Sequence, residues 1–436
     1  MQNTPQLRPA VAIAFSATLL LTPLCAAIGA LPAANRVSVE RLKPEPIRIE
    51  LDQVPGKASE NESTRPKVID PPENPVLRVP AGFEVNLFAD DLPQGRWLAL
   101  TPEGGVLCSA GRNNQVLLLQ DSDGDGAADK RSVFVDEDRG ANQPFGMAFA
   151  KVDGQWFFYL ANTNAVLRYP YREGQSELGP DFETITELPG NGYRQHWTRN
   201  IRVAPNGKEL FVTVGSKTDH DQESPPRASV LRMNLDGSDR VVFASGIRNP
   251  IGLDFHPVSG EPYVNVNERD KLGDELVPDY FTRIQQGQFY GWPYSFLTPD
   301  KLDPRRTTED GKSERPDLVK QTVTPDVLYQ SHSAALGLAF CSDKHFPEKY
   351  RGGAFAAFRG SSNRTEATGY KLVYVPFDDS HRPQGHYEDF LTGFLLDPTT
   401  GETWGRPVGV IFANDGSLLF TEDANGRIYR VSYSGT

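Results

Sequence analysis

A histidine stands directly before a strand-forming hairpin, in a chain that has only 7 histidines. The segment at 194–216 reads RQHWTRNIRVAPNGKELFVTVGS, in which IRVAP and ELFVTVG are rich in β-forming residues and PNG is a strong turn signal. A neutral imidazole can take a proton from a hydroxyl group, and nearby arginines disfavour its charged form. His196 is therefore a candidate general base, and a purely structural histidine is the alternative.

Arginines occupy comparable places in other segments of the chain. Arg248 in GIRNPIGL and Arg406 in TWGRPVGV precede similar strands, and Arg359 and Arg364 belong to the loop FRGSSNR. Because arginine binds carboxylates through paired hydrogen bonds, these residues would suit an anionic or carbonyl-rich ligand if they gather in space. The alternative is that each of them forms a structural salt bridge.

One acidic segment has the spacing of a calcium loop. DSDGDGAADKRS offers Asp121, Asp123, Asp125 and Asp129, although Ser132 stands where such loops carry a bidentate glutamate. The loop would join two strands at the surface. The sequence predicts a structural Ca²⁺ there, with a solvated acidic turn as the alternative.

A second acidic segment, NERDKLGDELVPD, follows a predicted strand. It contains Glu268, Asp270, Asp274 and Glu275 and no cluster of cysteine or histidine. Hard oxygen ligands of this kind favour Ca²⁺ over Zn²⁺. We therefore expect any metal bound by this segment to be calcium.

The elements that must position these residues are short strands separated by turns rich in Pro, Gly, Asn and Asp. Six such units can be counted, from RWLALTPEGGVLCSAGRNNQVLLL to RPVGVIFANDGSLLFTEDANGRIYRVS. All-strand units of about 40–50 residues indicate propeller blades, and no stretch has the period of a βαβ unit. The predicted fold is all-β, a six-bladed β-propeller, whose inner-strand entries converge on one channel. The residues at these entries are Gln143, His196, Arg199, Arg248 and Arg406.

The N-terminal part differs from the repeats. Residues 1–33 combine a basic residue, an apolar stretch interrupted by Pro23 and several small residues, which predicts a cleaved secretion signal, not a stable membrane span. Residues 34–77, rich in Pro, Glu and Lys, are predicted to form a linker or surface strap, and residues 78–436 the propeller. The product would be periplasmic or secreted. Cys108 and Cys341 are expected to be buried thiols.

Composition and missing motifs exclude several functions. The net charge of −12 is the wrong sign for binding a phosphate backbone, so nucleic acid is not an expected partner. The sequence contains no G-x-S-x-G elbow, no H-E-x-x-H motif and no P-loop. It also lacks a G-x-G-x-x-G turn between a strand and a helix, which argues against a Rossmann nicotinamide site.

Several long segments resemble one family, the glucose/sorbosone dehydrogenases, and most closely its L-sorbosone dehydrogenase-like branch. They include NQPFGMAFA, HWTRNIRVAPNGKELFVTVGS, ASGIRNPIGLDFHP, VNERDKLGDELVPDYFT and GRPVGVIFANDGSLLFTED, in the family's order from about residue 78 onward. Members of this family are secreted six-bladed β-propellers that use pyrroloquinoline quinone (PQQ). The resemblance therefore implies a PQQ- and Ca²⁺-dependent dehydrogenase.

The resemblance also implies roles for individual residues. His196 matches the general base, and Arg248 matches the arginine that polarises the quinone oxygens. Gln143 matches a cofactor contact, and Arg406 matches a residue that pairs with the PQQ carboxylates. Arg199 would be a neighbour of the cofactor.

Two further matches concern loops. Arg364, with Asn363 or Arg359 as alternatives, matches another cationic contact of the cofactor. Arg269 and Asp270 match the positions whose backbone carbonyls hold Ca²⁺, close to Asp274.

Departures from the glucose-oxidising branch put the substrate in question. Gln195 replaces an aspartate that orients the base, Ser216 replaces a second carboxylate, and Arg269-Asp270 replaces a Gly-Pro pair. The leading hypothesis is oxidation of a sugar, a sugar-derived aldehyde or a polyol-like alcohol, with electrons passed to a periplasmic acceptor. The alternatives are a propeller lactonase or other hydrolase, and a non-catalytic binding propeller.

Overall fold

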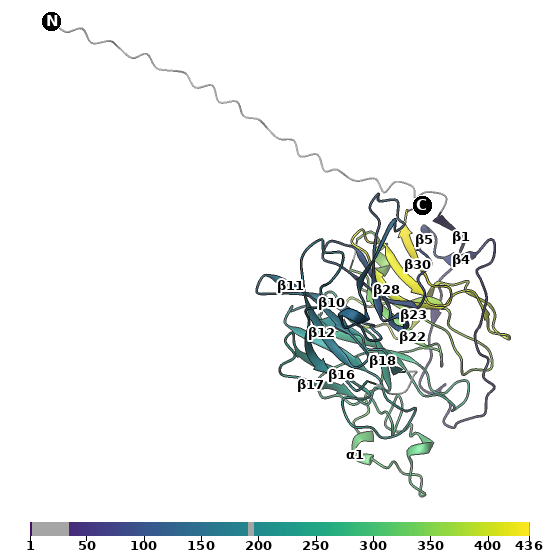
Figure 1. The fold of residues 1–436 in the computed structure, drawn as a ribbon. Helices are drawn as coiled ribbons and strands as arrows, with labels where there is room; N and C mark the ends of the chain where they lie inside the picture. The colour runs from purple at the N-terminus through teal and green to yellow at the C-terminus, as the bar shows by residue number, and fades with distance from the viewer. Residues whose placement is uncertain (2–34, 191–195, 343, 436) are drawn as a thin grey trace. The chain divides into compact units, whose positions relative to one another are not determined.

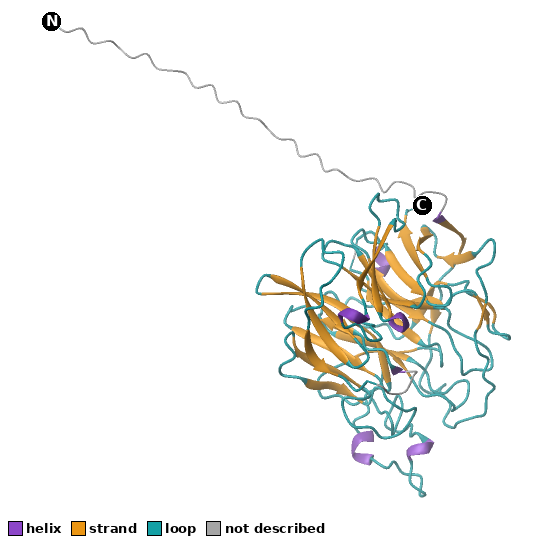
Figure 2. Cartoon of the chain, viewed as in Figure 1, coloured by secondary structure: helices purple, strands orange, loops and turns teal. Residues whose placement is uncertain are grey.

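Strands and loops make up nearly all of the protein (Figure 2). The computed structural model describes Met1 and residues 35–190, 196–342 and 344–435. These residues form seven β-sheets and a single α-helix of one turn, α1 (Pro316–Val319), which confirms the all-β prediction. No helix in these ranges is long and apolar enough to cross a membrane. The predicted signal at 1–33 lies outside the described residues, apart from Met1.

Four sheets each contain four consecutive antiparallel strands. These are β6 (Gly95–Leu100), β7 (Val106–Ala110), β8 (Gln115–Gln120) and β9 (Lys130–Val135); β10 (Met147–Val152), β11 (Gln155–Ala161), β12 (Ala165–Tyr171) and β13 (Glu183–Glu187); β14 (Ile201–Val203), β15 (Glu209–Val214), β16 (Ser229–Asn234) and β17 (Val241–Ser245); β18 (Asn249–Phe255), β19 (Pro262–Asn267), β20 (Tyr280–Arg283) and β21 (Val327–Leu328). The predicted hairpin turn between β14 and β15 is present. Gly207 lies at φ +67° and donates its N–H to Ala204 O at 2.8 Å.

Two further sheets recruit strands from the N-terminal segment. One contains β22 (Ala335–Phe340), β23 (Ala354–Phe358), β24 (Lys371–Val375), β25 (Tyr387–Leu391) and the edge strand β2 (Pro46–Ile47). The other has the order β28 (Pro407–Phe412), β29 (Leu418–Glu422), β30 (Arg427–Tyr433), β5 (Phe83–Ala89), β1 (Arg36–Arg41) and β4 (Val76–Val79). Strands β5 and β30 lie side by side and antiparallel, so the two ends of the repeat region share one sheet (Figure 1).

The first strands of successive sheets contact one another in a closed series. Strand β6 contacts β10, β10 contacts β14, and the series continues through β18, β22 and β28 back to β6. Glycines in these strands permit the close approach. A Cβ on Gly337 would lie 2.4 Å from Val408 O, and one on Gly409 would lie 2.5 Å from Arg96 O. Larger side chains at these positions would push neighbouring sheets apart.

The N-terminal segment runs over several sheets before the repeats begin. Strand β2 pairs with β25, Val54 joins an apolar cluster with β18 and β19, and β3 (Lys67–Val68) pairs with β27 (Glu402–Thr403). With β26 (Leu395–Asp397), these last two form a small three-stranded sheet. Between Val54 and β3 the chain hydrogen-bonds to Leu272 and Arg364, which lie in loops beside the site described below.

Apolar residues pack within and between the sheets. Cys108 and Cys341 are both buried, in different clusters of the core. The predicted burial of these two thiols is confirmed. A long insertion between β20 and β21 carries α1 and a 3-10 turn, Pro304–Arg306. Asp303 caps this turn and also accepts a hydrogen bond from Arg269 Nε at 2.8 Å, which ties the insertion to the loop after β19.

Candidate active site

A cavity of about 360 Å³ lies at one end of the first strands. Its walls come from the starts of β6, β18 and β22, from the segment before β14, and from loops that follow β7, β19 and β23. In an antiparallel hairpin the start of one strand and the end of the next lie at the same edge, so these residues face one space. The described lining residues are Arg96, Arg112, His196, Trp197, Thr198, Arg248, Asn249, Ile251, Asn267, Glu268, Asp270, Asp279, His332, Ala334, Leu336, Arg359, Gly360, Ser362 and Asn363.

His196 is buried, and its hydrogen bonds define its tautomer. Its Nδ1 lies 2.9 Å from Ser216 O and 3.0 Å from Ser216 Oγ. The Ser216 hydroxyl donates its own hydrogen to Thr218 O at 2.6 Å, so both atoms facing Nδ1 are acceptors and Nδ1 carries the proton. Nε2 is then the basic nitrogen. Burial, and next the charge of Arg248, hold the pKa of His196 well below 6.5, which keeps the ring neutral at pH 7.

Arg248 is held by two carboxylates. Its Nη2 lies 2.7 Å from Asp219 Oδ1 and 3.3 Å from Asp270 Oδ2. Asp219 in turn accepts hydrogen bonds from Asp270 N at 3.0 Å and from Arg305 Nη1 at 2.8 Å. Burial opposes ionisation of Asp219, but Arg248, the Asp270 N–H and Arg305 lower its pKa well below the usual range. The guanidinium of Arg248 is therefore a fixed cation on the cavity wall.

Three carboxylates line the cavity beyond Arg248. Asp279 accepts the N–H groups of Glu268 and Ala334, both at 2.8 Å, and burial raises its pKa to about 7. Glu268 Oε2 binds Arg269 Nη1 at 2.6 Å, whereas the buried Glu268 Oε1 has no hydrogen-bond partner. A buried carboxylate oxygen without a donor is costly unless a cation or water satisfies it. With Asp270, these residues give one side of the cavity an acidic lining that would favour a cation.

A second group on the cavity wall is cationic. Arg96 Nε lies 3.3 Å from Asp423 Oδ2, and Arg359 Nε binds both oxygens of the same carboxylate, at 3.0 and 2.9 Å. Arg112 lines the cavity near Arg96, whose guanidinium lies 5.6 Å from the ring centre of Trp197. Burial, despite Asp423, lowers the pKa of Arg96 to about 10. Arg96 and Arg359 share one carboxylate and Arg112 stands beside them, so this group attracts an anion.

Other predicted residues stand behind the cavity wall. Arg406 donates to Arg359 O and Gly360 O, both at 3.2 Å, and thereby holds the loop that carries Arg359. Arg199 is 1 % exposed and donates to His196 O at 2.8 Å and Thr198 O at 2.7 Å. Both arginines support the backbone of lining residues. Their direct contact with a cofactor stays a prediction.

The remaining predicted side chains also lie outside the described cavity lining. Gln143 is exposed at φ +46°. Arg269 is fully buried between Glu268 and Asp303. Arg364 donates to Asp274 O and to Glu275 Oε1, both at 2.5 Å, so it joins two loops at the cavity rim. Gln195, singled out as a departure, lies outside the described residues.

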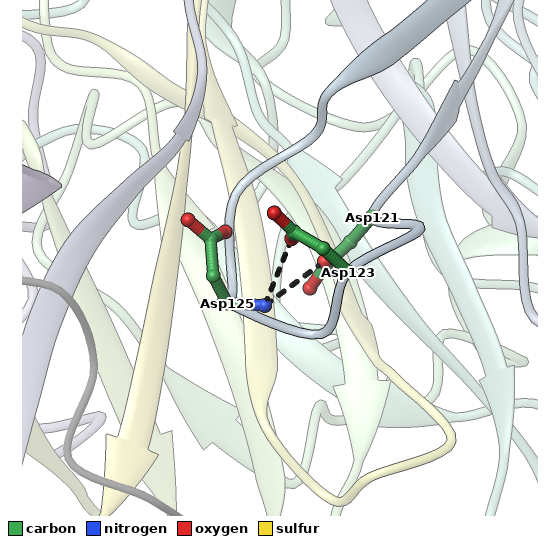
Figure 3. Close-up of side chains that lie close together, drawn as sticks. All are labelled: Asp121, Asp123 and Asp125. Atoms are coloured by element: carbon green, nitrogen blue, oxygen red, sulfur yellow. Dashed lines mark hydrogen bonds between the residues drawn. The ribbon is translucent and has the colours of Figure 1, made fainter.

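The predicted calcium loop lies apart, between β8 and β9. The carboxylates of Asp121, Asp123 and Asp125 each place an oxygen within 4.8 Å of the others (Figure 3). Asp121 Oδ1 accepts the N–H groups of Gly124 at 2.7 Å and Asp125 at 3.1 Å. Asp129 bonds to Ser122 at the base of the loop, at 2.5 Å from its hydroxyl. Metal binding by this loop stays a prediction.

Sequence reasoning missed several residues that line the cavity or hold its lining in place. Arg96 in GRWLAL is the second residue of β6, and Arg248 directly precedes β18, so their similar places were a signal for Arg96. Asp219, Asp279 and His332 lie in irregular loops, and no spacing pattern in the sequence connects them. Arg112 follows β7 on a short turn and carries no motif.

Comparisons with known proteins identify the family of the chain. A profile of the TrAA12-like family matches residues 77–434. A Hypocrea jecorina protein described as a pyrroloquinoline quinone-dependent sugar dehydrogenase is 24% identical over 405 residues, which cover 81% of this chain and 88% of that protein. The calcium structure of a Trichoderma reesei carbohydrate-active enzyme of family AA12 has a TM-score of 0.68 and 20% identity, and covers 85% of this chain and 99% of its own.

A second solved structure gives the same fold. The holo form of the pyranose dehydrogenase PQQ domain from Coprinopsis cinerea has a TM-score of 0.66 at 18% identity, and covers 85% of this chain and 100% of its own. The resemblance to PQQ-dependent sugar dehydrogenases that the sequence suggested is thereby confirmed. Because the matched profile spans most of the sequence, this chain belongs to the TrAA12-like family.

Proposed function

We propose that this protein is a PQQ- and Ca²⁺-dependent oxidoreductase that oxidises a sugar, a sugar-derived aldehyde or a polyol-like alcohol. The observation that carries the proposal is a neutral His196, with its proton fixed on Nδ1, in the same cavity as one cationic and one anionic group of side chains. Six sheets whose first strands contact each other in a closed series support a six-bladed propeller around this cavity.

The lining residues fit the proposed cofactor. PQQ carries three carboxylates, and Arg96, Arg112 and Arg359 offer guanidinium groups to hold them. Ca²⁺ prefers oxygen ligands, and the unpartnered Glu268 Oε1 belongs to the same cavity lining as Asp270 and Asp279. When bound, PQQ would supply the two-electron acceptor that side chains lack.

His196 would remove the hydroxyl proton of the substrate. Nε2 is the acceptor because Nδ1 donates to Ser216, and the lowered pKa keeps Nε2 unprotonated at neutral pH. As the proton arrives, the ring becomes a cation whose Nδ1–H remains bound to Ser216 O. Ser216 thus keeps the base in one orientation throughout the transfer.

Arg248 would stabilise negative charge that develops opposite the base. Its orientation is set by Asp219 and Asp270 before any ligand enters, so little reorganisation is needed. Its charge also keeps His196 neutral. Substrates with a hydroxyl next to a ring oxygen or carbonyl present the acidic proton and the acceptor atoms that such a site can use.

Binding and turnover experiments test the proposal. The purified protein would be titrated with PQQ in the presence of CaCl2 and followed by quinone absorbance. Reduction of an artificial dye would then be measured with aldoses, sugar-derived aldehydes and polyols. We expect saturable PQQ binding that requires Ca²⁺, and dye reduction with at least one of these classes. Absence of PQQ binding would overturn the proposal.

We also propose export to the periplasm or the medium, with an electron acceptor located there. The support is the signal-like sequence at 1–33. N-terminal sequencing of protein recovered from the periplasmic fraction and the medium should give a mature end near residue 34. Recovery of the intact N-terminus from the cytoplasm alone would contradict export.

A further inference from the structure

We infer that the N-terminal segment Ser59–Thr64, here called the strap, positions two loops of the proposed cofactor site. It lies against the outer side of two loops whose inner sides carry Asp270 and Asn363 into the cavity. The inference rests on the proposed function, because the two loops are those assigned to Ca²⁺ and PQQ. It adds a positioning role for residues that precede the repeats.

The strap contacts the loop after β19 through Ser59. Ser59 N donates to Leu272 O at 3.0 Å. The next residue, Gly273, lies at φ +111°, and a Cβ there would be 2.1 Å from Ser59 Oγ, so only glycine permits this contact. Gly273 O accepts His332 Nε2 at 2.9 Å, and His332 lines the cavity. The loop is therefore held between the strap outside and His332 inside.

The strap next binds the loop after β23. Thr64 N donates to Arg364 O at 2.9 Å. Ser63 Oγ donates to Asn363 Oδ1 at 3.3 Å, so the amide NH₂ of Asn363 is turned toward Asp270, whose Oδ1 it approaches at 3.4 Å. Through these two hydrogen bonds, the Ser63 hydroxyl orients the side-chain amide of Asn363, which in turn contacts the carboxylate of Asp270.

Asn61 joins the two loops. Its Nδ2 donates to Asp274 Oδ1 at 3.0 Å and to Asn363 O at 3.1 Å. Asp274 Oδ1 also accepts Thr365 N at 2.8 Å, so one carboxylate is shared between strap and loop. Because Asn61 is half-buried and neutral, replacement by aspartate keeps its size, removes the donor and places a second carboxylate beside Asp274. Asn61 is thus a positioning residue for Asp270 and Asn363.

The test compares Asn61→Asp and Ser63→Ala with a control at the far end of the N-terminal segment. The control, Lys67→Met, breaks the 2.8 Å pair of Lys67 with Glu402 in the small sheet that contains β3. The dissociation constant of PQQ in CaCl2 would be measured by quinone absorbance. The melting temperature without PQQ and CaCl2, and amide exchange in 271–275 and 361–366, would be measured alongside.

We expect Asn61→Asp to weaken PQQ binding about tenfold and Ser63→Ala about threefold, since losing a hydrogen bond to a charged or polar partner has effects of that order. Both variants should exchange faster in the two loops while melting near the wild-type temperature, and Lys67→Met should bind PQQ as the wild type does. Wild-type affinity in both strap variants, or equal weakening in Lys67→Met, would overturn the inference. A wild-type protein that binds no PQQ would instead overturn the proposed function, and the strap's role with it.

Discussion

The pKa of His196 depends on two nearby charges of opposite sign, Arg248 and Asp219. Arg248 lowers its pKa and Asp219 raises it, but burial and Arg248 dominate. The ring is therefore neutral in the folded protein and protonated in the unfolded chain below pH 6.5. Since the unfolded state then binds the extra proton, this residue makes the protein less stable as pH falls from 6.5 toward the lowered folded pKa. The same shift keeps the base active in mildly acidic solution.

The replacement His196→Gln tests the base directly. It preserves a polar side chain of similar reach but cannot accept the proton, so kcat should fall about 10²–10⁴-fold. PQQ affinity should change little, because the cationic group is untouched. Dye reduction at saturating PQQ, CaCl2 and substrate gives kcat. His386→Gln serves as control, because His386 is only partly buried and is not among the described lining residues. Unchanged kcat would remove His196 from the mechanism.

Ser216 offers a test through pH. The replacement Ser216→Asp places a carboxylate beside Nδ1, which stabilises the imidazolium and raises the pKa of His196. The acidic limb of the kcat/KM profile should move to higher pH, whereas in the wild type it lies well below pH 6.5. In Ser216→Ala the limb should stay in place, because Ser216 O still accepts from Nδ1. Profiles that coincide in all three proteins would contradict this account.

The residues proposed to be catalytic were easier to bring together from the sequence than the residues that hold them. Arg248 and His196 stand at repeat positions, so counting repeats was sufficient to bring them together. Asp219, which fixes Arg248, lies in a loop whose path depends on contacts with Asp270 and Arg305 from distant segments. Arg199 stands at a similar entry, yet it turns toward backbone carbonyls. Local sequence does not specify which way a long side chain turns.

At the scale of elements, the insertion between β20 and β21 reaches the site through Arg305. Its Nη1 binds Asp219 at 2.8 Å and its Nη2 binds Asp303 at 2.9 Å. The neighbouring Arg306 instead pairs with Glu314 inside the insertion, at 2.5 Å. One of two adjacent arginines therefore links to the cavity and the other does not.

This difference predicts separate effects of two matched replacements. Arg305→Met should lower kcat/KM about tenfold, because Asp219 loses one of the contacts that hold Arg248 in place. Arg306→Met should leave kcat/KM within about twofold, since its partner lies outside the cavity lining. Steady-state dye reduction and melting temperatures of both variants check this. Equal loss of kcat/KM in the two would mean that the insertion acts only through general stability.

Glycines in the first strands of neighbouring sheets are a second feature at the scale of elements. The replacement Gly337→Ala would place a methyl group 2.4 Å from Val408 O, which requires neighbouring sheets to move. We expect a loss of about 1–3 kcal/mol in the free energy of unfolding. Gly179→Ala is the matched control, because nothing lies within 4 Å of its Cβ and it should change stability by less than about 0.5 kcal/mol. Denaturant titration of both variants measures the two free energies of unfolding. Equal values would show that neighbouring sheets can move apart at little cost.

For the molecule as a whole, charge is unevenly distributed. The net charge is −12, yet Arg96, Arg112 and Arg359 gather on one side of a cavity, where Arg96 and Arg359 pair with the same carboxylate, Asp423. Binding of PQQ with Ca²⁺ to the folded state alone should raise the melting temperature in proportion to the logarithm of ligand concentration. Differential scanning calorimetry with and without both ligands measures this rise. A melting temperature unaffected by PQQ and CaCl2 together would contradict binding to the native state.

The repeated strand-turn-strand pattern was enough to predict an all-β fold, because each hairpin is encoded locally. The path of residues 35–79 was not predictable in detail. Its strands β2 and β3 pair with β25 and β27, which are far away in sequence. Residues such as Ser59 and Asn61 contact loops that carry no complementary pattern. Short polar segments gain their structure from the surface that they bind.

The pairing of β5 with β30 also affects how the chain is made. On the side where β30 will bind, β5 has no partner while all of the intervening strands are synthesised. An unpaired strand edge is a template for other chains, so this interval is the one in which aggregation competes with folding. A chaperone that shields Phe83–Ala89 until Arg427–Tyr433 has emerged would therefore protect the nascent protein at its most vulnerable point.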